Sequence, residues 1–340
     1  MGSETDKNRS PTNRRVTAAD VAKVAGVSRS AVSRAFTEGA YLDKHKKKHI
    51  LQVAEKLAYR PNLFAAGLQT KTSNVVAILA GQNRGIYDQE LLDGLLSALL
   101  AEGKFPIVLK GNEIAETPSL QGIFGFPVDA MIVRAGSVEP FIVEACSKLN
   151  IPLIFSGCIV EADNIDCVAC RNYEGMHQLV DMLIASGRRR FGYLDMVPNF
   201  AAKNQRPVAA EAALKEAGLQ LMAHGTADPS FDGGLSIATD LLKNNDLDAL
   251  VCANDEVALG ALTAARDVLN ISVPETLAIT GFDNISMSGW PNYQLTTATN
   301  PIDETIATIV RLLLERLDNP EKPGERVQLG AELILRQTHS

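Results

Sequence analysis

The chain has 340 residues, of which 46% are hydrophobic and 21% charged, so it has apolar material for more than one core and is not wholly disordered. No apolar run approaches the ~18–20 residues that span a bilayer, and the polar N-terminus lacks the apolar core of a secretion signal, so we expect a cytoplasmic protein with no membrane partner. Residues 1–74 carry 14 Lys and Arg against 6 Asp and Glu, whereas residues 75–340 carry 19 against 34, and this basic head favours a polyanionic partner.

The N-terminal part of the chain divides into an arm and a helical module. Residues 1–15 show no periodicity and are predicted to form a disordered arm, whereas residues 16–61 have the pattern of three short helices. Gly26 separates the first two helices, and Pro61 ends the module. Each helix is preceded by a side chain whose oxygen can accept from free backbone N–H groups: Thr17, Ser28 and Asp43.

The second of these helices has two fully separated faces when it is drawn at about 100° per residue. Its apolar face consists of Ala31, Val32, Ala35 and Phe36, and its polar face of Arg29, Ser30, Ser33 and Arg34. An arginine fork can bond O6 and N7 of guanine, and serine is small enough to let a helix lie deep in the major groove. We therefore expect this helix to read DNA bases; the alternative is an ordinary amphipathic helix.

Basic side chains crowd the third helix: Lys44, His45, Lys46, Lys47, Lys48 and His49. Such a cluster predicts attraction to phosphate that is independent of base sequence and strongly dependent on salt. Lys47 is the candidate phosphate contact. The alternative is a solvated lysine face without a partner.

Residues 16–36, VTAADVAKVAGVSRSAVSRAF, and residues 57–62, LAYRPN, resemble the DNA-binding headpiece of the lactose repressor/galactose repressor family of bacterial transcription regulators. The resemblance extends from about residue 16 to residue 337, and the headpiece motif is far more specific than a general helix-turn-helix. It implies a homodimer on a pseudo-palindromic, double-stranded operator whose bases are read by Arg29, Ser30 and Arg34. The expected phosphate contacts are Thr17, Ser28, Ser33, Lys47 and Asn62.

Residues 62–73 follow the headpiece and contain a short Gly-bearing segment that would be a marginal helix on its own. The resemblance implies a hinge helix that folds when two copies meet in the minor groove, with Ala65 beside the groove and Leu68 wedged between base pairs. Ala66 and Gly67 stand where many family members carry Arg and Ser, so the hinge is expected to be less helical, or less tightly bound to phosphate, than is typical. The alternative is that Leu68 packs against the body of the protein.

After Asn74 the pattern alternates between strands and helices, which predicts parallel sheets covered by helices on both faces. The predicted strands are 75–80, 105–109, 130–133, 152–155, 190–194, 249–252 and 277–281, with a final strand within 329–338. The predicted helices are 88–102, 139–149, 173–186, 202–217, 232–243, 254–268 and 302–317. The fold class is thus α/β, with an all-α headpiece and a body of doubly wound sheets in two lobes.

The resemblance implies that the two lobes are similar to periplasmic binding proteins and close on a small effector. We expect the N-lobe to comprise residues 74–185 and 300–319, and the C-lobe residues 186–299 and 320–340. Polar side chains just past strand ends are placed where open α/β sheets bind ligands. The candidate effector contacts are Tyr87, Arg134, Asn172, Arg206, Asn254 and Asp283.

Some of these residues have plainer alternatives. Asp283 is alternatively a turn residue, and Asp255 alternatively caps the helix that follows Asn254. A convergence of Arg134, Arg171 and Arg206 would suit a sugar acid or sugar phosphate better than a neutral sugar. The effector expectation therefore covers all three classes of sugar.

The five cysteines are scattered, and Cys167 and Cys170 lie three apart in a predicted strand without a second pair or a nearby His. We expect buried free thiols, no metal site and no cofactor. A phosphate loop, a GxSxG motif and paired metal ligands are all missing from the sequence, so we expect no enzyme activity. A solute-binding protein is the other alternative, and the basic headpiece argues against it. The sequence ends without a heptad repeat, which favours a dimer over a tetramer.

Overall fold

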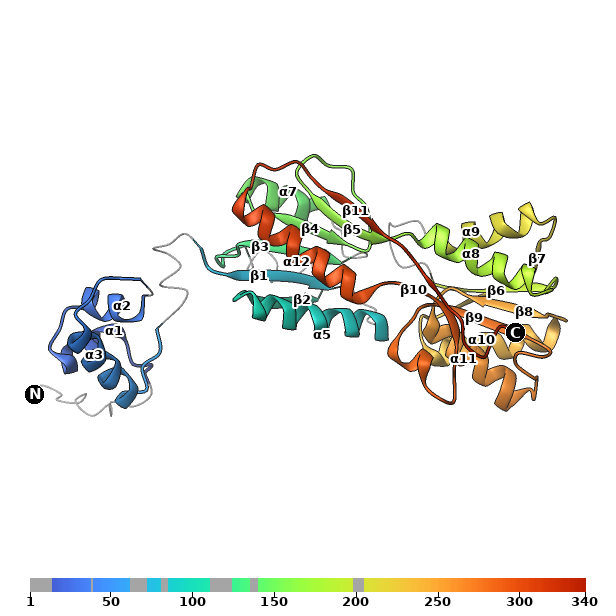
Figure 1. The fold of residues 1–340 in the computed structure, drawn as a ribbon, viewed down its shortest axis with the longest axis horizontal. Helices are drawn as coiled ribbons and strands as arrows, with labels where there is room; N and C mark the ends of the chain where they lie inside the picture. The colour runs from blue at the N-terminus through green and yellow to red at the C-terminus, as the bar shows by residue number, and fades with distance from the viewer. Residues whose placement is uncertain are drawn as a thin grey trace, which may run out of the picture. The chain divides into compact units, whose positions relative to one another are not determined.

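The computed structural model of the chain describes residues 14–37, 39–61, 72–80, 85–110, 124–134, 140–197 and 205–340. The chain divides into two compact units, Met1–Ser73 and Asn74–Ser340 (Figure 1). The hinge candidates Asn62, Ala65 and Leu68, together with most of the predicted arm, lie outside the described residues.

The first unit contains helices α1 (Ala18–Ala25), α2 (Arg29–Phe36) and α3 (Lys44–Lys56). The three predicted caps are confirmed: each side chain accepts a hydrogen bond from a backbone N–H in the first turn of its helix. Gly26 ends α1 at φ +63°, a left-handed conformation that glycine adopts without strain. The three helices share one small core of Val21, Ala22, Ala25, Ala31, Val32, Ala35, Ile50, Val53 and Ala54.

The second unit is built on two sheets, each with six strands among the described residues. The first sheet has the order β11-β5-β4-β3-β1-β2 and the second the order β12-β10-β9-β8-β6-β7. The strands of the first sheet are β1 (Val75–Ala80), β2 (Phe105–Lys110), β3 (Ala130–Arg134), β4 (Leu153–Ser156), β5 (Asp166–Cys170) and β11 (Arg326–Leu329). Those of the second are β6 (Phe191–Met196), β7 (Leu221–Ala227), β8 (Ala249–Cys252), β9 (Ala278–Asp283), β10 (Thr296–Thr299) and β12 (Leu333–Ile334). The described pairings are parallel except for that of β10 with β12.

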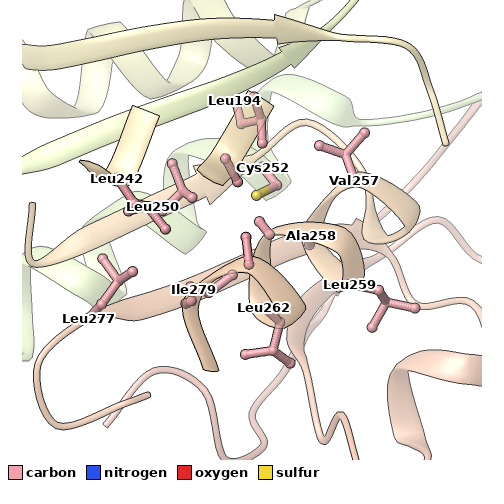
Figure 2. Packing of buried hydrophobic residues seen from close by; sticks show 14 of the residues in the cluster. Leu194, Leu242, Leu250, Cys252, Val257, Ala258, Leu259, Leu262, Leu277 and Ile279 are labelled. Atoms are coloured by element: carbon pink, nitrogen blue, oxygen red, sulfur yellow. The ribbon is translucent and has the colours of Figure 1, made fainter. Parts of the chain in front are cut away.

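Helices cover both faces of each sheet, as the alternating pattern predicts. The first sheet carries α5 (Ile86–Ala101) and α12 (Ile302–Asp318) on one face and α7 (Pro140–Leu149) on the other. The second carries α8 (Asn172–Ala185) and α9 (Gln205–Glu216) on one face, and α10 (Phe231–Asn244) and α11 (Asp255–Thr263) on the other. Two short helical segments, η1 (Ala264–Val268) and η2 (Ser286–Gly289), complete the second face. Figure 2 shows part of this core, where Cys252 and Ile279 of the sheet face Ala258 of α11.

The predicted fold class is confirmed, but the chain crosses between lobes at other places than we expected. We define the first lobe as the first sheet with α5, α7 and α12, and the second lobe as the second sheet with α8, α9, α10 and α11. Helix α8, expected in the N-lobe, packs in the second lobe because Met176, Leu179 and Leu183 share a core with Phe191 of β6. Conversely, β11, expected in the C-lobe, pairs with β5 of the first sheet. The expected lobe limits at residues 185 and 320 are therefore wrong.

Candidate DNA interface and effector site

In α2 the apolar face is turned into the headpiece core and the polar face is exposed. Ala31, Val32 and Ala35 are at most 3% exposed. The exposed polar side chains are Arg29, Ser30, Ser33 and Arg34. Phe36 departs from the expected pattern: it is 37% exposed and contacts the Tyr59 ring edge-on at a centroid distance of 5.6 Å. The exposed face thus presents two guanidinium groups between short hydroxyls.

The starts of α1 and α2 place hydroxyls and free backbone N–H groups at the surface. The Thr17 hydroxyl bonds Asp20 Oδ2 at 2.7 Å, and Ser28 Oγ accepts from the Ala31 N–H at 3.2 Å. Ser28 Oγ also lies 2.9 Å from Ser30 Oγ. Both caps are exposed, and helix N-termini of this kind favour phosphate through their free N–H groups.

Helix α3 carries its lysines at the surface. Lys44, Lys46 and Lys48 are exposed, and Lys47 is partly exposed. Within the part of the chain that the structure describes, none of the four forms an ion pair with a carboxylate. Their charges therefore remain available to an external anion such as DNA phosphate.

In the second lobe, Arg206 is the centre of a buried polar cluster. Its Nε donates to Asn172 Oδ1 at 2.9 Å, its Nη1 to the Ala253 carbonyl at 2.6 Å, and its Nη2 to Asp283 Oδ1 at 2.8 Å. The guanidinium also lies 3.8 Å above the centroid of the Phe282 ring. The cluster joins the starts of α8 and α9 to the carboxyl ends of β8 and β9, so three of the predicted effector residues meet here.

Asp283 ends β9 in an unusual backbone conformation, at φ +115°, and Asn284 follows at φ +55°. Its Oδ1 accepts from Arg206 and also from Asn300 Nδ2 at 3.2 Å. Burial raises the pKa of Asp283, although the adjacent Arg206 opposes that rise. Asp283 is thus a buried, paired carboxylate and not merely a turn residue.

At the end of β8, the neighbouring residues Asn254 and Asp255 divide two tasks between them. Asn254, and not Asp255, caps α11, because its Oδ1 accepts from the Val257 N–H at 3.0 Å. Asp255 is fully buried and accepts from the Ile285 N–H at 2.9 Å and from the hydroxyls of Ser288 and Thr297 at 2.6 Å. Burial, helped by the charge of Asp283, raises the pKa of Asp255 to about 6 against the effect of these hydrogen bonds.

The first lobe contributes Tyr87 and Arg134. Arg134 ends β3, where its Nη1 donates to Ser156 Oγ at 2.8 Å and its Nη2 forms an ion pair with Asp88. Its guanidinium lies 5.9 Å from the centroid of the Tyr87 ring. Tyr87 belongs to the first turn of α5 and packs against the core of the second lobe. Burial raises the pKa of Tyr87; the charge of Arg134 opposes that rise, and the charges of Asp283 and Asp88 add to it.

The three arginines do not form a common cationic pocket. Arg134 and Arg206 are each paired with a carboxylate, and Arg171 is exposed. Three acidic side chains lie near them: Asp88, Glu256 and Asp283. Burial raises the pKa of Glu256 and of Asp283, and the charge of Asp88 adds to both rises. Apart from the exposed Arg171, three carboxylates thus stand against two guanidinium groups in this region.

The described residues contain no group of three His, Cys, Asp or Glu side chains that could hold a metal ion. Among the helices that the structure describes, none is long and apolar enough to cross a membrane. The DNA interface and the effector site thus present hydrogen-bonding groups and ion pairs to a ligand.

Two family models match the chain, and they match its two units separately. Residues 17–62 match the model described as bacterial regulatory proteins, lacI family, and residues 180–339 match a periplasmic binding protein-like domain. The chain thus combines a lacI-family DNA-binding region with a periplasmic binding protein-like domain. This confirms the family that the headpiece motif resembles, and the LacI-family headpiece is a helix-turn-helix DNA-binding domain.

Related proteins align with this chain over almost its whole length. Catabolite control protein A of Priestia megaterium is 28% identical over 332 residues, which are 95% of this chain and 99% of that protein. A lac repressor dimer bound to operator and an anti-inducer has a similar fold, with a TM-score of 0.84 at 20% identity over 96% of this chain and 99% of its own. A complex of the transcriptional regulator CelR with cellobiose has a TM-score of 0.70 at 23% identity and covers 95% of this chain and 100% of its own.

Sequence reasoning missed two residues of the effector region, Asp255 and Glu256. Asp255 was interpreted only as a possible cap, because its partners Ser288 and Thr297 are more than 30 residues away. Glu256 accepts from the Ile86 N–H of the other lobe at 2.9 Å, a contact that only the tertiary fold creates. A carboxylate in the first turn of a helix normally indicates no more than a favourable interaction with that helix's own dipole.

Proposed function

We propose that the protein is a homodimeric transcriptional repressor that binds a palindromic operator in the cytoplasm and responds to a sugar bound between its two lobes. The exposed face of α2, with Arg29, Ser30 and Arg34 backed by a buried apolar face, is the observation that carries the proposal. One headpiece reads one half-site, so a twofold protein requires a palindromic site. In this proposal the phosphate contacts are Thr17, Ser28, Ser33, Lys47 and Asn62, and the minor-groove contacts are Ala65 and Leu68.

Replacing Arg29 or Arg34 with alanine is expected to relax base preference at one operator position, by about 1–3 kcal/mol of discrimination. Lys47→Ala is the matched contrast, because a lost phosphate contact weakens all sequences alike and lowers the salt slope by about one. Duplexes selected from a random pool, then varied one base pair at a time, are titrated with each variant at several salt concentrations. If both arginine variants behave like Lys47→Ala, then α2 is not the reading helix.

The effector site is proposed to lie at the carboxyl ends of the strands, with contacts from Tyr87, Arg134, Asn172, Arg206, Asn254 and Asp283. Arg134 and Arg206 are already neutralised by Asp88 and Asp283, and Glu256 adds a further negative charge nearby. A neutral sugar with several hydroxyls fits this balance better than a sugar acid or a sugar phosphate. The structural relative that holds cellobiose is consistent with that class.

A panel of neutral sugars, sugar acids and sugar phosphates tests the effector class by thermal unfolding of the full chain. The matching neutral sugar, at a hundredfold excess over its Kd, is expected to raise Tm by about 5–10 °C, since ligand binding at that excess stabilises by about 2.7 kcal/mol. The same sugar should change the affinity for operator DNA. Stabilisation by sugar acids or phosphates alone would show that the charge argument is wrong.

A further inference from the structure

Two carboxylates reach across between the lobes, one from each side. Glu256, in the first turn of α11 of the second lobe, accepts from the Ile86 N–H of the first lobe at 2.9 Å. Glu90, on α5 of the first lobe, accepts from the Ser286 N–H of the second lobe at 3.1 Å. Each lobe therefore provides one acceptor and one backbone donor.

The Ile86 N–H group lies at the N-terminus of α5, where the helix itself supplies no acceptor. Gly85 precedes this helix and has no side chain with which to cap it, so the first N–H groups of α5 need another acceptor. Glu256 provides that acceptor, and a negative charge at this place is also favoured by the helix dipole. The second lobe thus caps a helix of the first lobe.

Gly85 leaves room for this contact. Its φ of −64° is open to any residue, so glycine is not required here by the backbone. A Cβ at this position would instead collide with Oε2 of Glu256. The absence of a side chain at Gly85 is therefore matched to the position of the Glu256 carboxylate.

The capped turn of α5 carries groups of the effector site. Tyr87 packs against the core of the second lobe, and Asp88 forms the ion pair with Arg134 at the end of β3. Ser286 lies three residues after Asp283 and begins η2, whose Ser288 is bonded to Asp255. The Ile86 contact is thus one residue from Tyr87, and the Ser286 contact is three residues from Asp283.

We propose that Glu256 and Glu90 form a reciprocal latch that holds the two lobes together and positions Tyr87, Asp88 and Asp283 around the effector. The effect on effector binding rests on the proposed function, whereas the latch itself is a property of the two lobes. Because both contacts span the same interface, opening the lobes must break them together. Glu256 and Glu90 are positioning residues, and neither is required to touch the effector.

Amide hydrogen exchange of the full chain without added sugar tests the latch. Glu256→Ala is expected to increase exchange about tenfold or more at the Ile86 amide, its own donor, and also at the Ser286 amide, which keeps its acceptor. Glu90→Ala should also increase exchange at both amides: at Ser286, which loses its acceptor, and at Ile86, which keeps its own. Gly85→Ala should increase exchange at both amides although both carboxylates remain. Glu256→Gln retains an acceptor oxygen and should have a smaller effect.

Asp93→Ala is the matched control, since Asp93 is an exposed acid one turn further along α5. It should leave both amides protected. If each glutamate variant loses protection only at its own donor, the two contacts are independent local bonds and the latch is wrong.

A second measurement links the latch to the effector. Once the thermal panel has identified a sugar, its affinity should fall by a similar factor, about fivefold or more, in Glu256→Ala and Glu90→Ala, and the double variant should be little worse than either. Unchanged affinity in both variants would disprove the positioning role. If no sugar binds the unmodified protein, the proposed function fails, and the exchange results still decide whether the latch exists.

Discussion

Replacing Arg316 with methionine is expected to lower the free energy of unfolding by about 3–5 kcal/mol, because the buried Asp166 carboxylate loses both hydrogen bonds from the guanidinium. Lys322 then remains as its ion-pair partner at the longer distance of 3.8 Å. Arg316 is 1% exposed, and its guanidinium donates twice to Asp166, from Nε and from Nη2, at 2.9 Å each. It also donates to the carbonyls of Pro320, Lys322 and Pro323. One side chain therefore joins the end of α12, β5 and the turn that leads into β11.

Arg311→Met is the matched control for this prediction, since Arg311 lies on the same helix and also pairs with two acids, Glu315 and Glu325. It is about half exposed, so its loss should cost no more than about 1 kcal/mol. The comparison is made by urea unfolding at pH 7. A second variant, Arg316→Met with Asp166→Leu, should recover much of the lost stability because no buried charge is left unpaired. Equal losses for Arg311→Met and Arg316→Met would refute the argument.

Arg206→Ala is expected to remove effector binding and to destabilise the second lobe. The change takes away the partner of Asp283 and the donors to Asn172 and Ala253, and losing one member of a buried charge pair costs about 2–5 kcal/mol. The guanidinium's proposed hydrogen bond to the sugar is lost as well, and a hydrogen bond to a charged group contributes about 2 kcal/mol, which corresponds to a fall in affinity of about 30-fold. Isothermal titration of the sugar into the full chain gives the affinity, and urea unfolding gives the stability.

Two further variants separate binding from folding at this site. Arg171→Ala removes an exposed arginine next to Asn172 and should leave both affinity and stability nearly unchanged. Adding Asp283→Asn to Arg206→Ala should restore stability, because it removes the unpaired charge, but should not restore binding. If Arg171→Ala weakens the sugar as much as Arg206→Ala does, the buried cluster is not the effector site.

Local features of the fold could be predicted because they depend on neighbouring residues. The caps at Thr17, Ser28 and Asp43 and the two faces of α2 follow from spacing alone, and so does the alternation of strands and helices after Asn74. The strands that sequence reasoning missed, β7, β10 and β11, are short, polar or at a sheet edge. In β7 exposed and partly buried residues alternate, and only the last residue, Ala227, is fully buried. The strand therefore lacks the continuous apolar pattern of a buried parallel strand.

The site was predictable where a residue follows a buried strand and not where its role depends on distant partners. Asn172 and Asp283 follow strands and Arg206 was proposed from the family resemblance, but the hydrogen bonds among the three could not be predicted. A shared cationic pocket of three arginines, which the sequence left open, does not form, because the carboxylates of Asp88 and Asp283 neutralise two of them. Pairing of this kind is set by the packing of whole lobes, and no local pattern encodes it.

The two strands added last along the chain have a consequence for synthesis on the ribosome. β11 completes an edge of the first sheet and β12 an edge of the second, and both come from residues 326–334. Neither lobe can reach its final form during translation until these residues have left the exit tunnel. A nascent chain therefore carries two unfinished sheet edges at once, and a stop codon before residue 326 would leave both open to aggregation and to cellular proteases.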